Sequence, residues 1–279
     1  MARYAGEPLA AGPSRTESRD AETLLMTMEA TVAELDISEQ STSCHHGRMP
    51  SAPLLPMSPR QQLRAGRLPR RLVQLLTGLT LFGGSLAMMI RAQLGLAPWD
   101  VFHYGVAVHL PLSFGMVTII VGACVLLSWI PLRQMPGVGT VANIFVIGIV
   151  TDAALSVLTT PGALWQRAVL LAAGIVLNGL AGAMYIGSQL GPGPRDGLMT
   201  GLVQRTGRSV GLVRTAIELT VLAAGWLMGG VAGVGTVAYA LGIGPIVHVL
   251  LPRLTVRLEP GSTEEPRVGA ALPESSTSG

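Results

Sequence analysis

Two short stretches decide how this chain is organised: Gly95-Leu-Ala-Pro98-Trp-Asp100 and, 96 positions later (191 − 95 = 96), Gly191-Pro-Gly-Pro194-Arg-Asp196. At the same offset, Gly137-Val-Gly-Thr-Val-Ala142 recurs unchanged as residues 233–238. Residues 73–155 align with residues 169–251 without a gap. Self-similarity at one fixed offset is the mark of a duplicated unit, so we expect two repeats, at 70–160 and 161–258.

The composition places both repeats in a membrane. Hydrophobic residues make up 49% of the chain, charged residues only 13%, and the mean hydropathy is +0.51. A soluble domain has roughly 25% charged residues. The 19 cationic side chains are all arginine, and they flank the apolar segments instead of forming one basic face. The expected partner is therefore the lipid bilayer and not a nucleic acid.

The hydropathy pattern predicts six spanning helices, because six runs approach the roughly 20 apolar residues that a spanning helix needs. Two shorter stretches, 99–110 and 196–208, are left over. The second contains Arg205 and Arg208, and an arginine at the bilayer centre costs about 2.5 kcal/mol or more. The predicted fold is thus an all-α polytopic bundle with a short half-helix in each repeat. The spans are expected at about 72–92, 114–132, 138–158, 165–187, 211–230 and 234–252.

The arginines also predict the orientation. With six spans, segments 93–113, 159–164 and 231–233 lie on one side and contain no arginine. The positive-inside rule then predicts a bacterial inner-membrane protein with both termini in the cytoplasm. Each repeat crosses three times, and three is odd, so the second repeat is predicted to be inverted relative to the first. The arginines on the cytoplasmic side are Arg60, Arg64, Arg67, Arg70, Arg71, Arg133, Arg195, Arg205, Arg208, Arg253 and Arg257.

The polar tails, 1–69 and 259–279, lack helical periodicity and are predicted to be disordered. Met57 precedes a basic run and is expected to be the true start of translation. No metal site is predicted, since Cys44, His45 and His46 lack the further ligands that close a zinc site.

The Pro-x-Asp turns admit two interpretations. In both, the proline ends a span and the aspartate caps the short helix that follows. In the first interpretation, two half-helices enter from opposite faces and aim their positive ends at a substrate path inside the membrane. In the second, they are interfacial helices, and Trp99 is a membrane anchor. The path residues of the first interpretation are Pro98, Asp100, His103, Pro194, Arg195 and Asp196.

Further polar residues lie inside the predicted spans. Thr140 and Thr236 open equivalent spans, where helix packing is the favoured interpretation and a substrate path shared with Asn143 is the alternative. Arg214 and Glu218 have the i,i+4 spacing of an ion pair, which we favour over a proton relay.

Two other polar positions lie near or within the spans. Asp152 and His248 are equivalent in the two repeats and are either a titrating pair or water-exposed helix ends. Asn178 is expected to bond a neighbouring helix.

Several motifs together resemble a known family. They are Arg91-Ala-x-Leu-Gly-Leu-x-Pro98-Trp-Asp100-Val-x-His103-x-Gly105, Trp129-Ile-Pro-Leu-Arg133, Pro136-Gly-x-Gly-Thr-Val-Ala-Asn143 and Gly191-Pro-Gly-Pro-Arg-Asp-Gly-Leu-Met-Thr-Gly201. Over about residues 60–257 the chain is similar to the bacterial YczE-type membrane proteins of the YczE, YyaS and YitT group. The resemblance implies an integral inner-membrane protein and implies no substrate.

Two classes of function remain. The first is a transporter or channel for a small polar solute or ion. The second is a non-transporting scaffold or accessory protein whose inner face, with Arg205 and Arg208, binds a cytoplasmic or membrane partner. An enzyme is not expected, because the sequence has no nucleophile elbow, phosphate loop or paired-histidine zinc motif. No catalytic residue or cofactor is predicted, and self-association into a homo-oligomer stays open.

Overall fold

A computed structural model describes residues 59–258, in which all regular structure is helical. Within these residues, six helices are long and apolar enough to cross a membrane, as predicted. They are α3 (Leu68–Ala92), α5 (Phe114–Leu132), α6 (Val138–Val157), α7 (Leu164–Gly187), α9 (Val210–Leu227) and α10 (Val234–Leu254). The two leftover stretches form the shorter helices α4 (Pro98–His109) and α8 (Pro194–Thr206).

The N-terminal tail differs in part from the prediction. Residues 59–64, expected to be disordered, form helix α2 (Pro59–Arg64). This helix is tied to the bundle because the Arg71 guanidinium donates a hydrogen bond to the Gln62 carbonyl at 2.5 Å. The remaining tail predictions, those on residues 1–58 with Met57 and the Cys44 cluster and on 259–279, lie outside the described residues.

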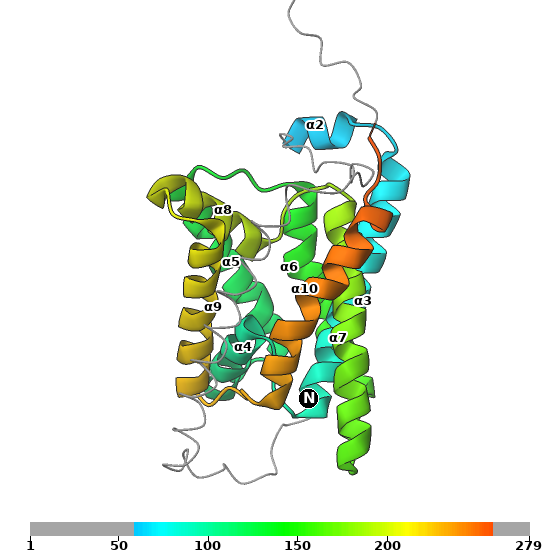
Figure 1. Ribbon diagram of the computed structural model, residues 1–279, viewed down its shortest axis with the longest axis vertical. Helices are drawn as coiled ribbons and strands as arrows, with labels where there is room; N and C mark the ends of the chain where they lie inside the picture. The colour runs from blue at the N-terminus through cyan, green and yellow to red at the C-terminus, as the bar shows by residue number, and fades with distance from the viewer. Residues whose placement is uncertain (1–58, 259–279) are drawn as a thin grey trace, which may run out of the picture.

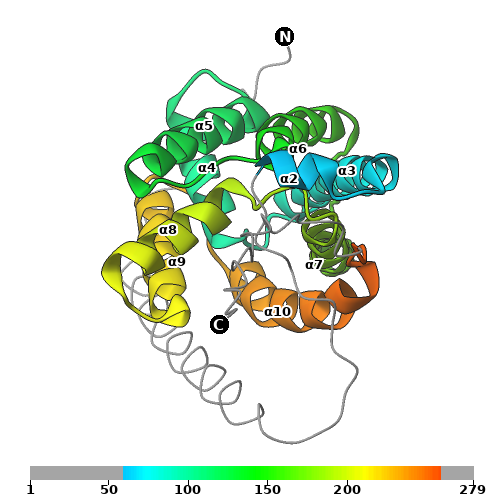
Figure 2. The same cartoon turned by 90° about the horizontal axis from the view of Figure 1, so that it is seen from above.

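Helix α4 lies between the long helices α5 and α9, whereas α8 lies at the edge of the bundle over α9 (Figure 2). Seen from above, α5 and α6, then α3 and α7, then α10 and α9 follow one another around the periphery (Figure 2). Helix α3 packs along both α6 and α7, and α10 packs along α7. The short helices lie near opposite ends of the bundle, α4 low and α8 high in Figure 1. Helix α4 packs on α9 and helix α8 packs on α5, so each short helix binds a span of the other half of the chain.

The same backbone turn precedes both short helices. Gln93 and Gln189 leave the helical conformation with φ of 52° and 55°. Gly95 and Gly191 follow with φ of 123° and 126°, a conformation that is readily accessible only to glycine. A proline with its fixed φ then opens α4 and α8. A span therefore stops sharply in each half, and the chain turns back into the bundle as a short helix.

Each of these turns also caps a helix of the other half. The Gly235 amide at the start of α10 donates to the Leu94 carbonyl at 2.7 Å. The Gly139 amide at the start of α6 donates to the Leu190 carbonyl at 2.8 Å. First-turn amides have no partner within their own helix, so these bonds satisfy groups that would be costly to leave unpaired in a membrane. The four residues form two pairs related by the 96-residue offset.

Two arginines at equivalent positions in the two halves of the chain cap the C-terminal ends of α7 and α3, the first span of each half. Arg71 Nε, near the start of α3, donates to the Ser188 carbonyl at 2.8 Å. Arg167 Nε, near the start of α7, donates to the Ala92 carbonyl at 2.7 Å. Each arginine also donates to the next carbonyl along the chain, Arg71 to that of Gln189 and Arg167 to that of Gln93. A guanidinium satisfies the unpaired carbonyls at a helix C-terminus and complements its negative dipole end. Arg167 therefore has a structural role at the C-terminal end of α3.

The short helices use different contacts with their partner spans. A Cβ at Gly105 of α4 would lie 2.6 Å from the Gly225 carbonyl oxygen of α9, so these two backbones touch directly. On the other side, the Trp129 indole of α5 donates to the Pro194 carbonyl at 3.0 Å, and the ring lies against Gly197 of α8. Small residues on the short helices therefore let both helices pack closely against their partner spans.

Candidate functional site

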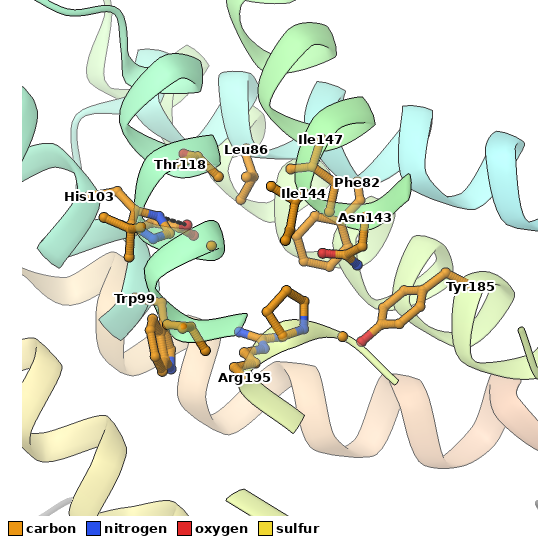
Figure 3. A pocket seen from close by; sticks show the side chains of 16 residues that line it. Phe82, Leu86, Trp99, His103, Thr118, Asn143, Ile144, Ile147, Tyr185 and Arg195 are labelled. Carbon is orange, nitrogen blue, oxygen red and sulfur yellow. Dashed lines mark ion pairs between the residues drawn. The ribbon is translucent and has the colours of Figure 1, made fainter. Parts of the chain in front are cut away.

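A cavity of ≈ 90 Å³ lies between the first turns of α4 and α8. A single buried water molecule needs roughly 10–15 Å³, so the cavity has room for a small solute. Its apolar walls come from the middle of α3, α5 and α6 (Figure 3). These wall residues are Phe82, Leu86, Val121, Val125, Ile144 and Ile147.

Helix α4 brings a carboxylate and an imidazole to this cavity. Asp100 Oδ1 lies 3.7 Å from His103 Nδ1, and both side chains are 10% exposed. His103 Nδ1 is buried and has no hydrogen-bond partner among residues 59–258. The ring is held by Phe114, edge to face at a centroid distance of 6.1 Å. The imidazole is therefore fixed in place with an unsatisfied nitrogen.

Trp99 also lines the cavity, which corrects its expected role as an interfacial anchor. The residue is only 9% exposed, because α4 is enclosed between α5 and α9 instead of lying on the membrane surface. Its ring packs against His103 at a centroid distance of 6.4 Å.

Helix α8 brings a second carboxylate, but this one is already engaged. Asp196 Oδ2 accepts hydrogen bonds from the Tyr185 hydroxyl at 2.9 Å and from the Gly193 amide at 3.2 Å. The aspartate thereby caps its own helix, as the sequence predicts. The residue before α4 is Ala97, which offers no side-chain cap, and Asp100 faces His103 instead. The two aspartates align in sequence and make different contacts.

Arg195 places a positive charge in the cavity wall next to this cap. It is the second residue of α8, and Figure 3 shows it between Trp99 and Tyr185. Burial acts to lower the pKa of the guanidinium, but neighbouring oxygens, chiefly those of Tyr239 and Asp196, outweigh burial and raise it. The guanidinium therefore stays charged.

A hydrogen-bonded chain across three spans supports this region. The Tyr239 hydroxyl of α10 donates to Asn178 Oδ1 of α7 at 3.0 Å. Asn178 Nδ2 in turn donates to Ser85 Oγ of α3 at 2.9 Å. The expected bond from Asn178 to a neighbouring helix is confirmed. Sequence patterns did not point to Tyr185, whose hydroxyl bonds Asp196 at the cavity, because a lone tyrosine in an apolar run belongs to no motif.

The remaining predicted path residues divide into two groups. Asn143 lines the cavity. Thr140 does not, because its hydroxyl donates to the Pro192 carbonyl at 2.7 Å and accepts from the Gly137 amide at 3.1 Å. The Thr236 hydroxyl likewise accepts a hydrogen bond from the Gly233 amide at 3.2 Å. Thr140 thus bonds across to the other half of the chain, as the packing interpretation expects, whereas the bond of Thr236 caps its own helix.

Four other polar residues that the sequence analysis singles out lie away from the cavity lining. Arg214 Nε and Glu218 Oε1 of α9 are 3.2 Å apart, with side chains 60% and 37% exposed, as expected for a structural ion pair. Asp152 accepts from the Ser113 hydroxyl and from the Gly115 amide, so it caps α5. His248 is exposed on α10, and no ion pair joins it to Asp152 within the described part of the chain.

Comparison with known families agrees with the predicted resemblance. Residues 69–252, more than half of the chain, match the model of a family described as "Family of unknown function (DUF6198)". The chain belongs to this family. The similarity of this DUF6198 member to YczE and YyaS is confirmed by the relatives described next. No solved structure matches the chain.

Three relatives of this DUF6198 member cover similar lengths. An uncharacterized protein of Haemophilus influenzae is 37% identical over 63% of the chain and 81% of the relative. The uncharacterized membrane protein YczE of Bacillus subtilis is 36% identical over 62% and 80%. The uncharacterized protein YyaS of the same organism is 24% identical over 63% and 89%. With six apolar helices among the residues that the structure describes, this DUF6198 member is an integral, multi-pass membrane protein.

Proposed function

We propose that this DUF6198 member is a transporter or channel for a small polar solute or ion, with the cavity between α4 and α8 as its solute site. One observation carries the proposal: the first turns of two short helices, from opposite halves of the chain, border a single cavity that contains Asp100, His103 and Arg195. Ionisable groups inside a membrane bundle are expensive and mark solute pathways. Short helices that end at a site inside the bundle are a recurring feature of transporters.

The two halves are, in this proposal, inverted copies of one unit. The reciprocal caps support this: Leu94 with Gly235 mirrors Leu190 with Gly139, and the Arg71 contact mirrors the Arg167 contact. The positions of α4 and α8 near opposite ends of the bundle also support it. Rocking of one half against the other would then expose the cavity to each side in turn.

The arginine distribution adds an orientation to the proposal. On this basis we propose a location in the bacterial inner membrane, with both termini and the C-terminal end of α8 in the cytoplasm. The C-terminal end of α4 then faces the opposite compartment.

Cysteine labelling tests the inverted arrangement. His109 at the end of α4 and Thr206 at the end of α8 are both exposed. In a background with Cys44→Ser and Cys124→Ser, we expect a membrane-impermeant maleimide to label His109→Cys in intact cells. Thr206→Cys should be labelled only after permeabilisation. Labelling of both positions from the same side would contradict the inversion.

Tracer uptake into proteoliposomes tests the transport function itself. With a panel of inorganic ions, sugars, amines, carboxylates and amino acids, we expect uptake of at least one solute. Asp100→Asn and His103→Gln should each lower that uptake about 10-fold or more, since hydrogen bonds to charged groups contribute roughly 1.5–3 kcal/mol.

His248→Gln is the matched control for His103→Gln, because His248 is exposed on α10 and does not line the cavity. Its uptake should equal that of the unaltered protein. Absence of uptake across the whole panel would contradict a transporter or channel. A defined protein partner that co-purifies under those conditions would favour the scaffold.

A further inference from the structure

The cavity holds two opposite charges that do not neutralise each other. Asp100 comes from the first turn of α4 and Arg195 from the first turn of α8, and both line the cavity. Within residues 59–258, no ion pair joins them. Buried or partly buried charges in proteins are normally paired. A ligand with one charge of each sign would pair both.

On the α4 side, the residues favour binding of a cationic group that also donates a hydrogen bond. Asp100 is 7% exposed, and the Nδ1 atom of its neighbour His103 is buried without a hydrogen-bond partner. An unsatisfied buried polar atom costs roughly 1–3 kcal/mol, so a polar partner at this point is favoured. An ammonium group has several N–H donors for the carboxylate and the imidazole. The Trp99 ring beside them adds a surface that attracts cations.

On the α8 side, the structure favours an anion. Arg195 is the second residue of its helix, where the positive end of the helix dipole disfavours a cationic side chain. The aligned position in the first half is Trp99, so the charge belongs to one side of the cavity only. Within residues 59–258 no ion pair joins the guanidinium to Asp196, which is bonded to Tyr185 and Gly193, although the oxygens of Tyr239 and Asp196 stabilise its charge. A carboxylate in the cavity would give the guanidinium a direct ionic partner. A planar guanidinium binds carboxylates with two parallel hydrogen bonds.

We propose that the cavity binds a small zwitterion, with its ammonium end at Asp100 and His103 and its carboxylate end at Arg195. This inference rests on the proposed transport function and names the substrate class of the same site. The volume of ≈ 90 Å³ suits a solute of a few heavy atoms, and the apolar walls between the two charges suit a short hydrocarbon segment. A simple anion would leave Asp100 with only the imidazole of His103, and a simple cation would leave Arg195 with only the oxygens of Tyr239 and Asp196.

Binding to the purified full-length protein tests the proposal without requiring transport. The probes are radiolabelled glycine, alanine and β-alanine, measured by a scintillation proximity assay in detergent. Propionate and ethylamine are the matched competitors, since each equals alanine without one of its charged groups. We expect at least one zwitterion to bind, and both competitors to displace it at least ~10-fold more weakly than alanine itself.

Two variants then assign the ends of the ligand. Asp100→Asn should weaken the zwitterion about 10-fold without weakening propionate, whereas Arg195→Gln should weaken the zwitterion similarly without weakening ethylamine. Size-exclusion profiles in detergent show whether each variant is folded. If a variant does not fold, the same comparison among alanine, propionate and ethylamine on the unaltered protein still decides the proposal.

The outcomes separate this inference from the transport function. If no zwitterion binds but another solute is taken up by proteoliposomes, the zwitterion site is wrong and the transport function stands. If a zwitterion binds with the expected charge preference but no solute is taken up, the site stands and transport is wrong. Propionate or ethylamine binding as tightly as alanine would overturn the zwitterion site.

Discussion

Replacing Arg71 with methionine is expected to destabilise the purified protein by about 3–5 kcal/mol, the range for breaking a buried, charged hydrogen-bond network. For a domain of this size, that corresponds to a fall in melting temperature of roughly 10 °C. Arg71 is fully buried and donates to three carbonyls, those of Ser188, Gln189 and Gln62. Methionine fills similar space and donates to none of them. The three acceptors would be left without their donors inside the bundle.

The measurement is a thermal melt monitored by size-exclusion chromatography in detergent. Arg70→Gln is the matched control, since Arg70 is the exposed neighbour on the same helix turn and should shift the melt by less than about 2 °C. Arg167→Met should give an intermediate fall, because two of its three bonds are exposed to solvent. Equal melting temperatures for the Arg70 and Arg71 variants would contradict the capping role.

Gly95→Ala is expected to destabilise the protein by at least ~3 kcal/mol, for two additive reasons. The φ of 123° at Gly95 is a conformation that alanine rarely adopts. An added Cβ would also lie 2.8 Å from the Thr236 amide nitrogen and 2.9 Å from that of Gly233. Both nitrogens are backbone atoms at the start of α10, so the clash cannot be relieved by a rotamer change. The turn that leads into the cavity would have to move.

Gly207→Ala is the control that separates backbone strain from a steric clash. Gly207 also has a positive φ, 64°, but nothing lies within 4 Å of an added Cβ. Gly207→Ala should therefore destabilise the protein by only about 1–2 kcal/mol, the ordinary penalty for a left-handed conformation. Both variants are compared in the same thermal melt. A smaller effect at Gly95 than at Gly207 would show that the turn does not hold α10 in place.

Much of the fold could be predicted from the sequence because its signals are local. A run of about 20 apolar residues is long enough to cross a bilayer wherever it lies in the chain. The shortness and arginines of 196–208 excluded a seventh crossing, and α8 indeed ends at Thr206. The glycine and proline of each Pro-x-Asp turn restrict the backbone directly, so both turns lie where the motif predicted.

The roles of individual polar residues were harder to predict, since they depend on neighbours distant in the chain. Asp100 and Asp196 align, yet only Asp196 caps its helix, because Tyr185 and Gly193 meet it there. Arg71 and Arg167 also align. Their alignment could be seen in the sequence, but the carbonyl that Arg71 caps lies 117 positions away from it, and the one that Arg167 caps lies 75 positions away.

The sequence alone determined the six spans, the two short helices and the turns before them, because hydropathy and backbone restriction act within a few residues. Only the tertiary structure decided that the first turns of α4 and α8 border one cavity, and that Trp99 is buried in it. It also decided that Asp100 and Arg195 face that cavity without pairing with each other, among the residues described. These features arise from helix packing across the two halves, where charge and shape meet between segments that no local pattern connects.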